Sequence, residues 1–65
     1  MSKGETPYEM AVRHVAEQRA RIIRQHARIG EMWRIGAPTE DADDFLHQMN
    51  DVLDVMIADL DRLSN

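Results

Sequence analysis

The helical pattern of the sequence has one clear break, at Gly36-Ala37-Pro38-Thr39, which separates two long segments with helical patterns of their own. Gly36 suits the left-handed conformation that often follows a helix end, and Pro38 cannot continue a helix. Thr39 is a good N-cap for a second helix, and acidic residues crowd the turns after it. Two helices joined by so short a connection lie antiparallel and side by side, so the break predicts a helical hairpin.

The two segments have opposite charges. Residues 1–36 hold seven Lys and Arg against four Glu, a net charge of +3, whereas residues 37–65 hold one Arg against eight Asp and Glu, a net charge of −7. We therefore expect the basic and the acidic helix to fold back on each other. The whole chain carries a charge of −4, which argues mildly against a dedicated nucleic-acid binder.

The chain is too short to stabilise itself through a large core. At 65 residues it forms one domain at most, and a hairpin cannot cover its own apolar faces. Cysteine is absent, which removes disulfides and thiolate metal sites. Association is the remaining common solution, so we predict an all-α fold in which two hairpins dimerise into a four-helix bundle.

The boundaries of the domain follow from local signals. Thr6 can cap a helix, Pro7 suits the first helical position, and Glu9 completes a capping box. We predict a disordered N-terminus over 1–5 and a single hairpin domain over 6–65. The parts of this domain are a helix over 7–35, a turn over 36–39 and a helix over 40–63.

The apolar residues indicate which surfaces pack. The second segment repeats them at alternating spacings of four and three, which is a heptad seam. The first segment is less regular, because its apolar arc spans three neighbouring rows and contains small residues that would admit another helix closely. We place the contact between the first helices of a dimer there. The predicted hairpin and dimer interfaces comprise Val12, Ala16, Ile22, Ile23, Ala27, Leu46, Met49, Leu53, Met56 and Leu60.

Two polar residues, Arg19 and His26, interrupt the middle row of that arc. A charge in a small core is costly unless it is paired. We therefore expect Arg19 to find a carboxylate, Asp59 or Asp54, within the hairpin or across a dimer, and His26 to be half-buried with a hydrogen-bond partner. A wholly exposed Arg19 would contradict this orientation of the first helix.

The remaining arginines of the first segment form a stripe. Glu9, Glu17 and Glu31 are spaced to neutralise much of it, which leaves Arg24 and Arg28 the least compensated. These two arginines are candidates for phosphate contacts with RNA or DNA. The interpretation that we favour is a surface that complements the acidic helix.

No catalytic constellation is visible. There is no Cys nucleophile, the two serines lie near the chain ends, and the glycines are isolated. His47 has Asp43 and Asp51 nearby, but one imidazole among aspartates is a weak metal signal. We expect no enzyme activity, no metal, no cofactor and no small-molecule substrate. Without an apolar leader or a membrane-spanning run, we expect a cytoplasmic protein.

The function that we favour is a small structural or interaction protein that homodimerises and presents charged helix faces to a macromolecule, preferably a protein. The rival is a nucleic-acid-binding regulator. In length and layout, residues 6–64 resemble the plasmid copy-number protein Rop, although no motif is shared. That resemblance implies a dimer that binds RNA through the basic faces of its first helices. A third alternative is a hairpin that completes the bundle of another protein.

Overall fold

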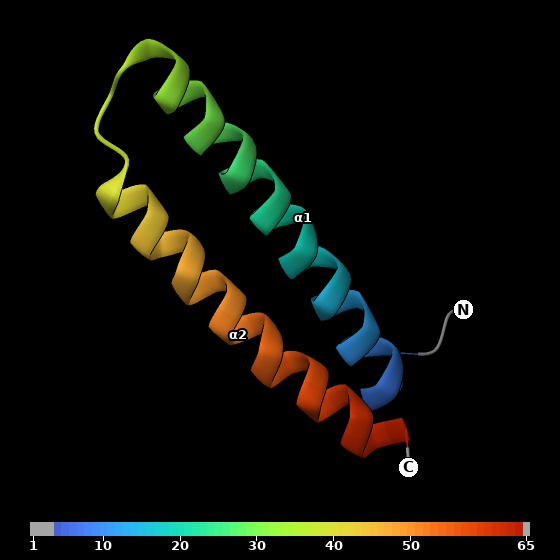
Figure 1. The fold of residues 1–65 in the computed structure, drawn as a ribbon. Coiled ribbons are helices and arrows are strands. Elements are labelled where there is room, and N and C mark those ends of the chain that lie inside the picture. Colours follow the sequence, from blue (N-terminus) through green and yellow to red (C-terminus); the bar gives the residue numbers. More distant parts are fainter. Residues whose placement is uncertain (1–3, 65) are drawn as a thin grey trace.

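The computed structural model describes residues 4–64 and contains two helices, α1 (Pro7–Ile35) and α2 (Glu40–Ser64). They run antiparallel and pack along their length, with the turn at one end and both chain termini at the other (Figure 1). The predicted all-α hairpin is therefore confirmed. The Cα atoms extend 49 × 27 × 12 Å, so the molecule is a single layer of two helices with both broad faces open.

The start of α1 is built as its sequence indicates. The Thr6 hydroxyl accepts a hydrogen bond from the Glu9 backbone N–H at 3.1 Å, and the Glu9 carboxylate accepts one from the Thr6 N–H at 2.9 Å. This reciprocal capping box satisfies two backbone donors that a helix N-terminus leaves without a partner. The disorder expected over 1–5 falls largely on residues 1–3, which lie outside the described residues, but the Glu5 carboxylate is bonded to Arg13.

The turn ends α1 in a Schellman motif. Gly36 has φ 77° and ψ 19°, its N–H donates to the Trp33 carbonyl at 3.2 Å, and the Ala37 N–H donates to the Met32 carbonyl at 2.9 Å. The new helix begins at once, since the Asp43 N–H donates to the Thr39 carbonyl at 2.7 Å. Backbone hydrogen bonds therefore close the connection on both sides.

The face of α1 that meets α2 includes two glutamines. Gln18, which is 5% exposed, donates from Nε2 to the Met49 carbonyl at 2.9 Å, and Gln25 donates to the Ala42 carbonyl at 3.2 Å. Both glutamines follow the same heptad spacing as the apolar residues around them. The buried and half-buried residues along the helix–helix interface are Ala11, Val15, Gln18, Ile22, Gln25, Ile29 and Met32 of α1, and Ala42, Leu46, Met49, Leu53, Met56 and Leu60 of α2.

This orientation corrects the one expected for α1. Arg19 and His26 are exposed, one position beyond the glutamines on the helix, so neither is buried in the hairpin. A neutral amide can reach a carbonyl of α2 without the cost of burying a charge, whereas a guanidinium would need a carboxylate opposite it. Val12, Ala16, Ile23 and Ala27 are also exposed, so within one chain they do not form the interface predicted for them.

The core that results is thin. The most deeply buried apolar side chains of the described residues are Val15, Ile29 and Met49, which are 7–8% exposed, and none there is fully buried. A two-helix layer offers each side chain neighbours on one side only. The hairpin alone therefore buries little of the apolar surface on which folding depends.

The turn gives a first prediction. Gly36→Ala should lower the free energy of unfolding by about 1 kcal/mol, because a Cβ disfavours the positive φ of this residue. Urea titration at a fixed protein concentration measures the change. Gly4→Ala is the matched control, since Gly4 does not have a positive φ, and equal effects of the two substitutions would contradict this role for Gly36.

The hydrogen bond from Gln18 to α2 gives a second prediction. Gln18→Ala should lower the free energy of unfolding by about 1–2 kcal/mol, because it removes a buried hydrogen bond and leaves a gap between the helices. Gln48→Ala, at an exposed position of α2, should change it by less than about 0.5 kcal/mol. Thermal unfolding followed by circular dichroism compares the two variants.

Candidate interaction surfaces

Helical geometry divides the exposed residues between the two broad faces of the hairpin. Successive residues turn by about 100°, so those one position after each interface residue lie on one face and those one position before lie on the other. Because the helices are antiparallel, residues that precede the interface on α1 share a face with those that precede it on α2. The grooves of the structure agree, since one groove brings Arg24 and Arg28 of α1 together with Phe45 of α2.

The first surface, here called the tryptophan face, contains the residues that follow the interface. Its α1 part holds Tyr8 at the outer end and an apolar strip with Arg19 and His26 within it. Ile23 and Trp33 in this strip are both 69% exposed, and nothing in the hairpin covers them. The strip comprises Val12, Ala16, Ile23, Gly30 and Trp33.

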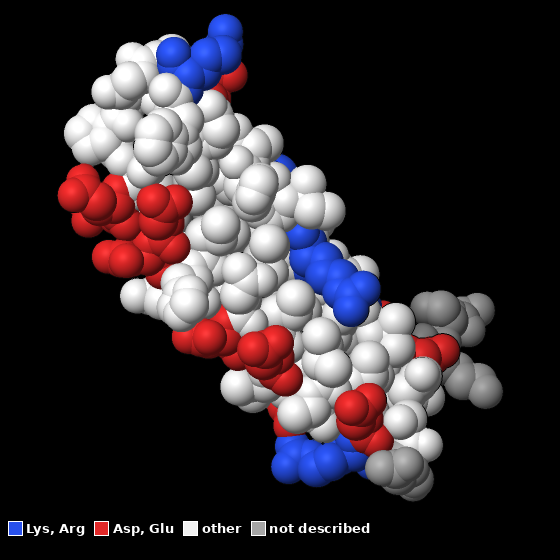
Figure 2. Space-filling model, viewed as in Figure 1, with Lys and Arg blue, Asp and Glu red and all other residues white. Residues whose placement is uncertain are grey.

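On the α2 side, the tryptophan face is acidic. Asp43, Asp54 and Asp61 follow interface residues and are exposed, and half-buried Ile57 lies among them. Figure 2 shows acidic side chains along α2 beside a wide uncharged band, with basic side chains interrupting the α1 side of that band. A surface with an apolar strip and a charged margin is typical of a protein interface.

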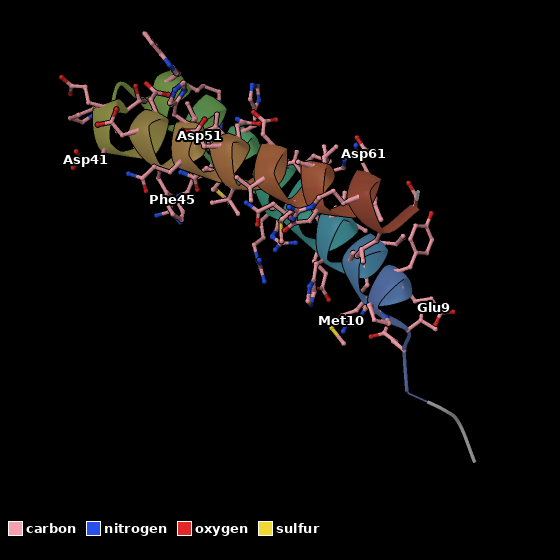
Figure 3. The ribbon with its side chains drawn as sticks, turned by 90° about the horizontal axis from the view of Figure 1, so that it is seen from below. Glu9, Met10, Asp41, Phe45, Asp51 and Asp61 are labelled. Carbon is pink, nitrogen blue, oxygen red and sulfur yellow. The ribbon has the colours of Figure 1, made fainter. Side chains whose placement is uncertain are left out.

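The second surface, here called the arginine face, contains the residues that precede the interface. Phe45 and Met10, from opposite ends of the hairpin, both project to this side, which is the lower edge in Figure 3. A groove of about 470 Å³ lies here between the helices. It is lined by Arg21, Arg24, Gln25, Arg28, Phe45 and Met49.

The groove continues along α2. A second hollow of about 260 Å³ shares Arg21, Phe45 and Met49 with the first and extends to Val52. Phe45 is 52% exposed in spite of its size. The two hollows together form a channel with arginines on the α1 side and apolar side chains on the α2 side.

The ion pairs of the described residues are all local. Arg13 bonds to Glu5 at 2.8 Å and to Glu17 at 3.2 Å, Arg34 pairs with Glu31, and Arg62 pairs with Asp59. No ion pair there joins α1 to α2, although their opposite charges led us to expect attraction across the hairpin. The helices are held together by apolar packing and glutamine hydrogen bonds instead.

Arg24 and Arg28 are uncompensated by acidic side chains among the described residues, as the sequence predicts. Neither forms an ion pair with any described residue, because Glu17 and Glu31 are bound to Arg13 and Arg34. Arg21 also lacks a carboxylate there and donates only to the Gln18 side chain, at 3.4 Å. The groove therefore presents three cations to an incoming ligand.

The predicted polar pairing is not formed within the hairpin. Asp59 lies on the arginine face and bonds to Arg62, whereas Arg19 lies on the opposite face. Arg19 forms no ion pair with any residue of the described range, so a carboxylate across a dimer stays a prediction for it. Asp59 instead borders a hollow of about 420 Å³ at the open end of the hairpin, together with His14 and Met10.

Some features of the surfaces were not found from the sequence. The interface role of Gln18 and Gln25 was missed, although both continue the heptad row of Ala11 and Met32. The exposed position of Phe45, which lies beside the heptad seam of α2, was not predicted from the sequence either. Among residues 4–64, no three His, Asp or Glu side chains gather closely enough to hold a metal ion.

Comparisons with known proteins add no further identification. No protein-family model, no curated protein and no solved structure matches the chain. In the described part of the chain, neither helix is long and apolar enough to cross a membrane.

The N-terminal ion pair predicts a pH dependence. The hydrogen bond and the charge of Arg13 hold the pKa of Glu5 below its usual value of 4.5, and the carboxylate raises the pKa of Arg13. Because the folded-state pKa of Glu5 is the lower one, the pair stabilises the fold above pH 4.5, and this contribution is lost as the pH falls through the folded-state pKa.

Glu5→Gln should therefore be less stable than the wild type at pH 7, and the difference should vanish in acid. Thermal unfolding from neutral pH to pH 3 would follow it. In the Arg13→Gln background the substitution should have no such effect. A difference that persists in that background would assign the effect of Glu5 to another contact.

Proposed function

We propose that this protein is a non-enzymatic interaction module that homodimerises through the tryptophan face and presents the arginine face to a macromolecular partner. The observation that carries the proposal is the contrast between a core of three buried apolar residues and a long exposed apolar strip on α1. A hairpin in this state gains stability from any partner that covers the strip.

A second copy is the simplest partner for the tryptophan face. Two tryptophan faces laid together give four helices around one core, which is the arrangement in which helical hairpins become stable bundles. Small residues at Ala16 and Gly30 favour a close approach of the two α1 helices. A standard interface needs about 800 Å² from each copy, a modest part of the 5254 Å² that the hairpin exposes.

The charges of this face fit a dimer. Arg19 lies in the apolar strip and forms no ion pair with any residue between 4 and 64, and the α2 margin of the same face carries Asp54, which is equally unpaired within that range. We expect Arg19 to reach Asp54 or a neighbouring carboxylate of the second copy as the faces close. Such a pair would favour one relative placement of the two hairpins over others.

The rival function is binding of RNA or DNA by the basic face of α1, as in Rop. The unpaired Arg24 and Arg28 favour it. A dimer closed through the tryptophan face, however, holds its two arginine faces on opposite outer surfaces. The continuous basic strip that this function needs would then not form, so we place nucleic acid second.

The dimer is tested by one substitution on each face. Ile23→Glu should convert a species of twice the chain mass into a monomer with less helix, because it puts a charge into the proposed interface. Val55→Glu makes the same chemical change at a position that is 63% exposed on the opposite face, and it should leave the dimer intact.

Light scattering on a size-exclusion column and circular dichroism measure both variants. A wild-type protein that is a well-folded monomer at low and high salt would refute dimerisation. If Val55→Glu and not Ile23→Glu gave the monomer, the dimer would form through the arginine face.

A further inference from the structure

We propose that the groove on the arginine face binds an acidic amphipathic helix of another protein. The inference deepens the proposed function by naming the chemistry of the partner. It depends only on the arginine face of one hairpin, so the groove and the dimer can fail separately.

The floor of the groove suits a helix. Phe45 and Val52 are seven residues apart on α2, which places them in one line along the helix axis, and Met49 lies between them at the bottom of the channel. Phe45 and Val52 are about half exposed, so the line remains open to a ligand. An apolar line of this length accepts side chains spaced three or four residues apart on an incoming helix.

The wall of the groove determines the charge of that helix. Arg21, Arg24 and Arg28 follow one another at spacings of three and four on α1, so they form one row about 10 Å long. A helix lying parallel to this row would present carboxylates to it at the same spacings. The partner is therefore apolar on the side that meets α2 and acidic on the side that meets α1.

Nucleic acid fits this groove less well. Asp41 is exposed on the arginine face of α2, and Asp44 and Asp51 are exposed on its outer side, so a phosphate backbone that approached the channel from α2 would meet three carboxylates that repel it. A peptide helix can turn a neutral or basic side toward these aspartates while its acidic side meets the arginines. The three arginines therefore favour a ligand that carries its negative charge on one side only, as an amphipathic helix does.

The probe for this site is a designed helical peptide of 18 residues with a leucine stripe and glutamates along one flank. Its matched control carries lysine at every glutamate position. With the full chain at low salt, the glutamate peptide should raise fluorescence anisotropy on binding and should dissociate as salt rises, whereas the lysine peptide should not bind.

Substitutions assign the binding to the groove. Arg24→Gln with Arg28→Gln should weaken it about tenfold, which corresponds to loss of two partly exposed ion pairs. Arg19→Gln removes one positive charge from the opposite face, where Arg19 forms no ion pair with any residue of 4–64, and it should leave the affinity unchanged. Phe45→Ala should weaken binding without loss of helix, which circular dichroism checks, because Phe45 is half exposed.

Three outcomes would overturn the proposal. Equal binding of the glutamate and lysine peptides would show apolar adhesion without charge selection. Tight binding of a 20-nucleotide single strand, lost in the double arginine variant while the peptide has no effect, would assign the groove to nucleic acid. A species larger than a dimer that Phe45→Ala reduces to a dimer would assign it to a further copy of this chain.

Discussion

The hydrogen bonds from Gln18 and Gln25 to the carbonyls of α2 fix how α1 is rotated about its own axis, and the character of both surfaces depends on that rotation. The two amides lie in the same heptad register as Val15 and Ile29, so they complete the packed face where apolar residues are absent. Turning α1 by one residue would bury Arg19 in place of Gln18. It would also carry the apolar strip of the tryptophan face into the hairpin and turn Val15 and Ile29 outward in its place.

The thin core of the hairpin and the exposed apolar strip of α1 both follow from this rotation of α1. A chain of this size can direct its apolar residues toward its own second helix or toward another molecule, but it has too few to do both fully. Here α1 uses glutamine, alanine and a few larger side chains against α2 and keeps Ile23 and Trp33 outside. We read this division as the arrangement of a subunit, in which association completes the core.

Local chemistry made the ends of the helices predictable. Thr6 with Glu9, and Gly36 before Pro38, each indicate a conformation within a few residues, and the structure has the hydrogen bonds that those residues imply. The rotation of α1 could not be predicted in the same way, because three rows of that helix are apolar enough to pack. Hydropathy ranks glutamine and arginine alike as polar, and only the geometry of an amide reaching a carbonyl separates Gln18 from Arg19.

Charge segregation was expected to close the hairpin, but the ion pairs of the described residues all stay within a helix or beside its cap. Exposed pairs contribute little to stability, so the fold loses little by leaving its basic and acidic stripes apart. What the segregation does provide is a row of cations on α1, Arg21, Arg24 and Arg28, in a molecule whose second helix is acidic over most of its length. Under the proposed function, such a charge distribution would orient an approaching acidic partner at the arginine groove, where the three arginines form no ion pair with any residue of the described range.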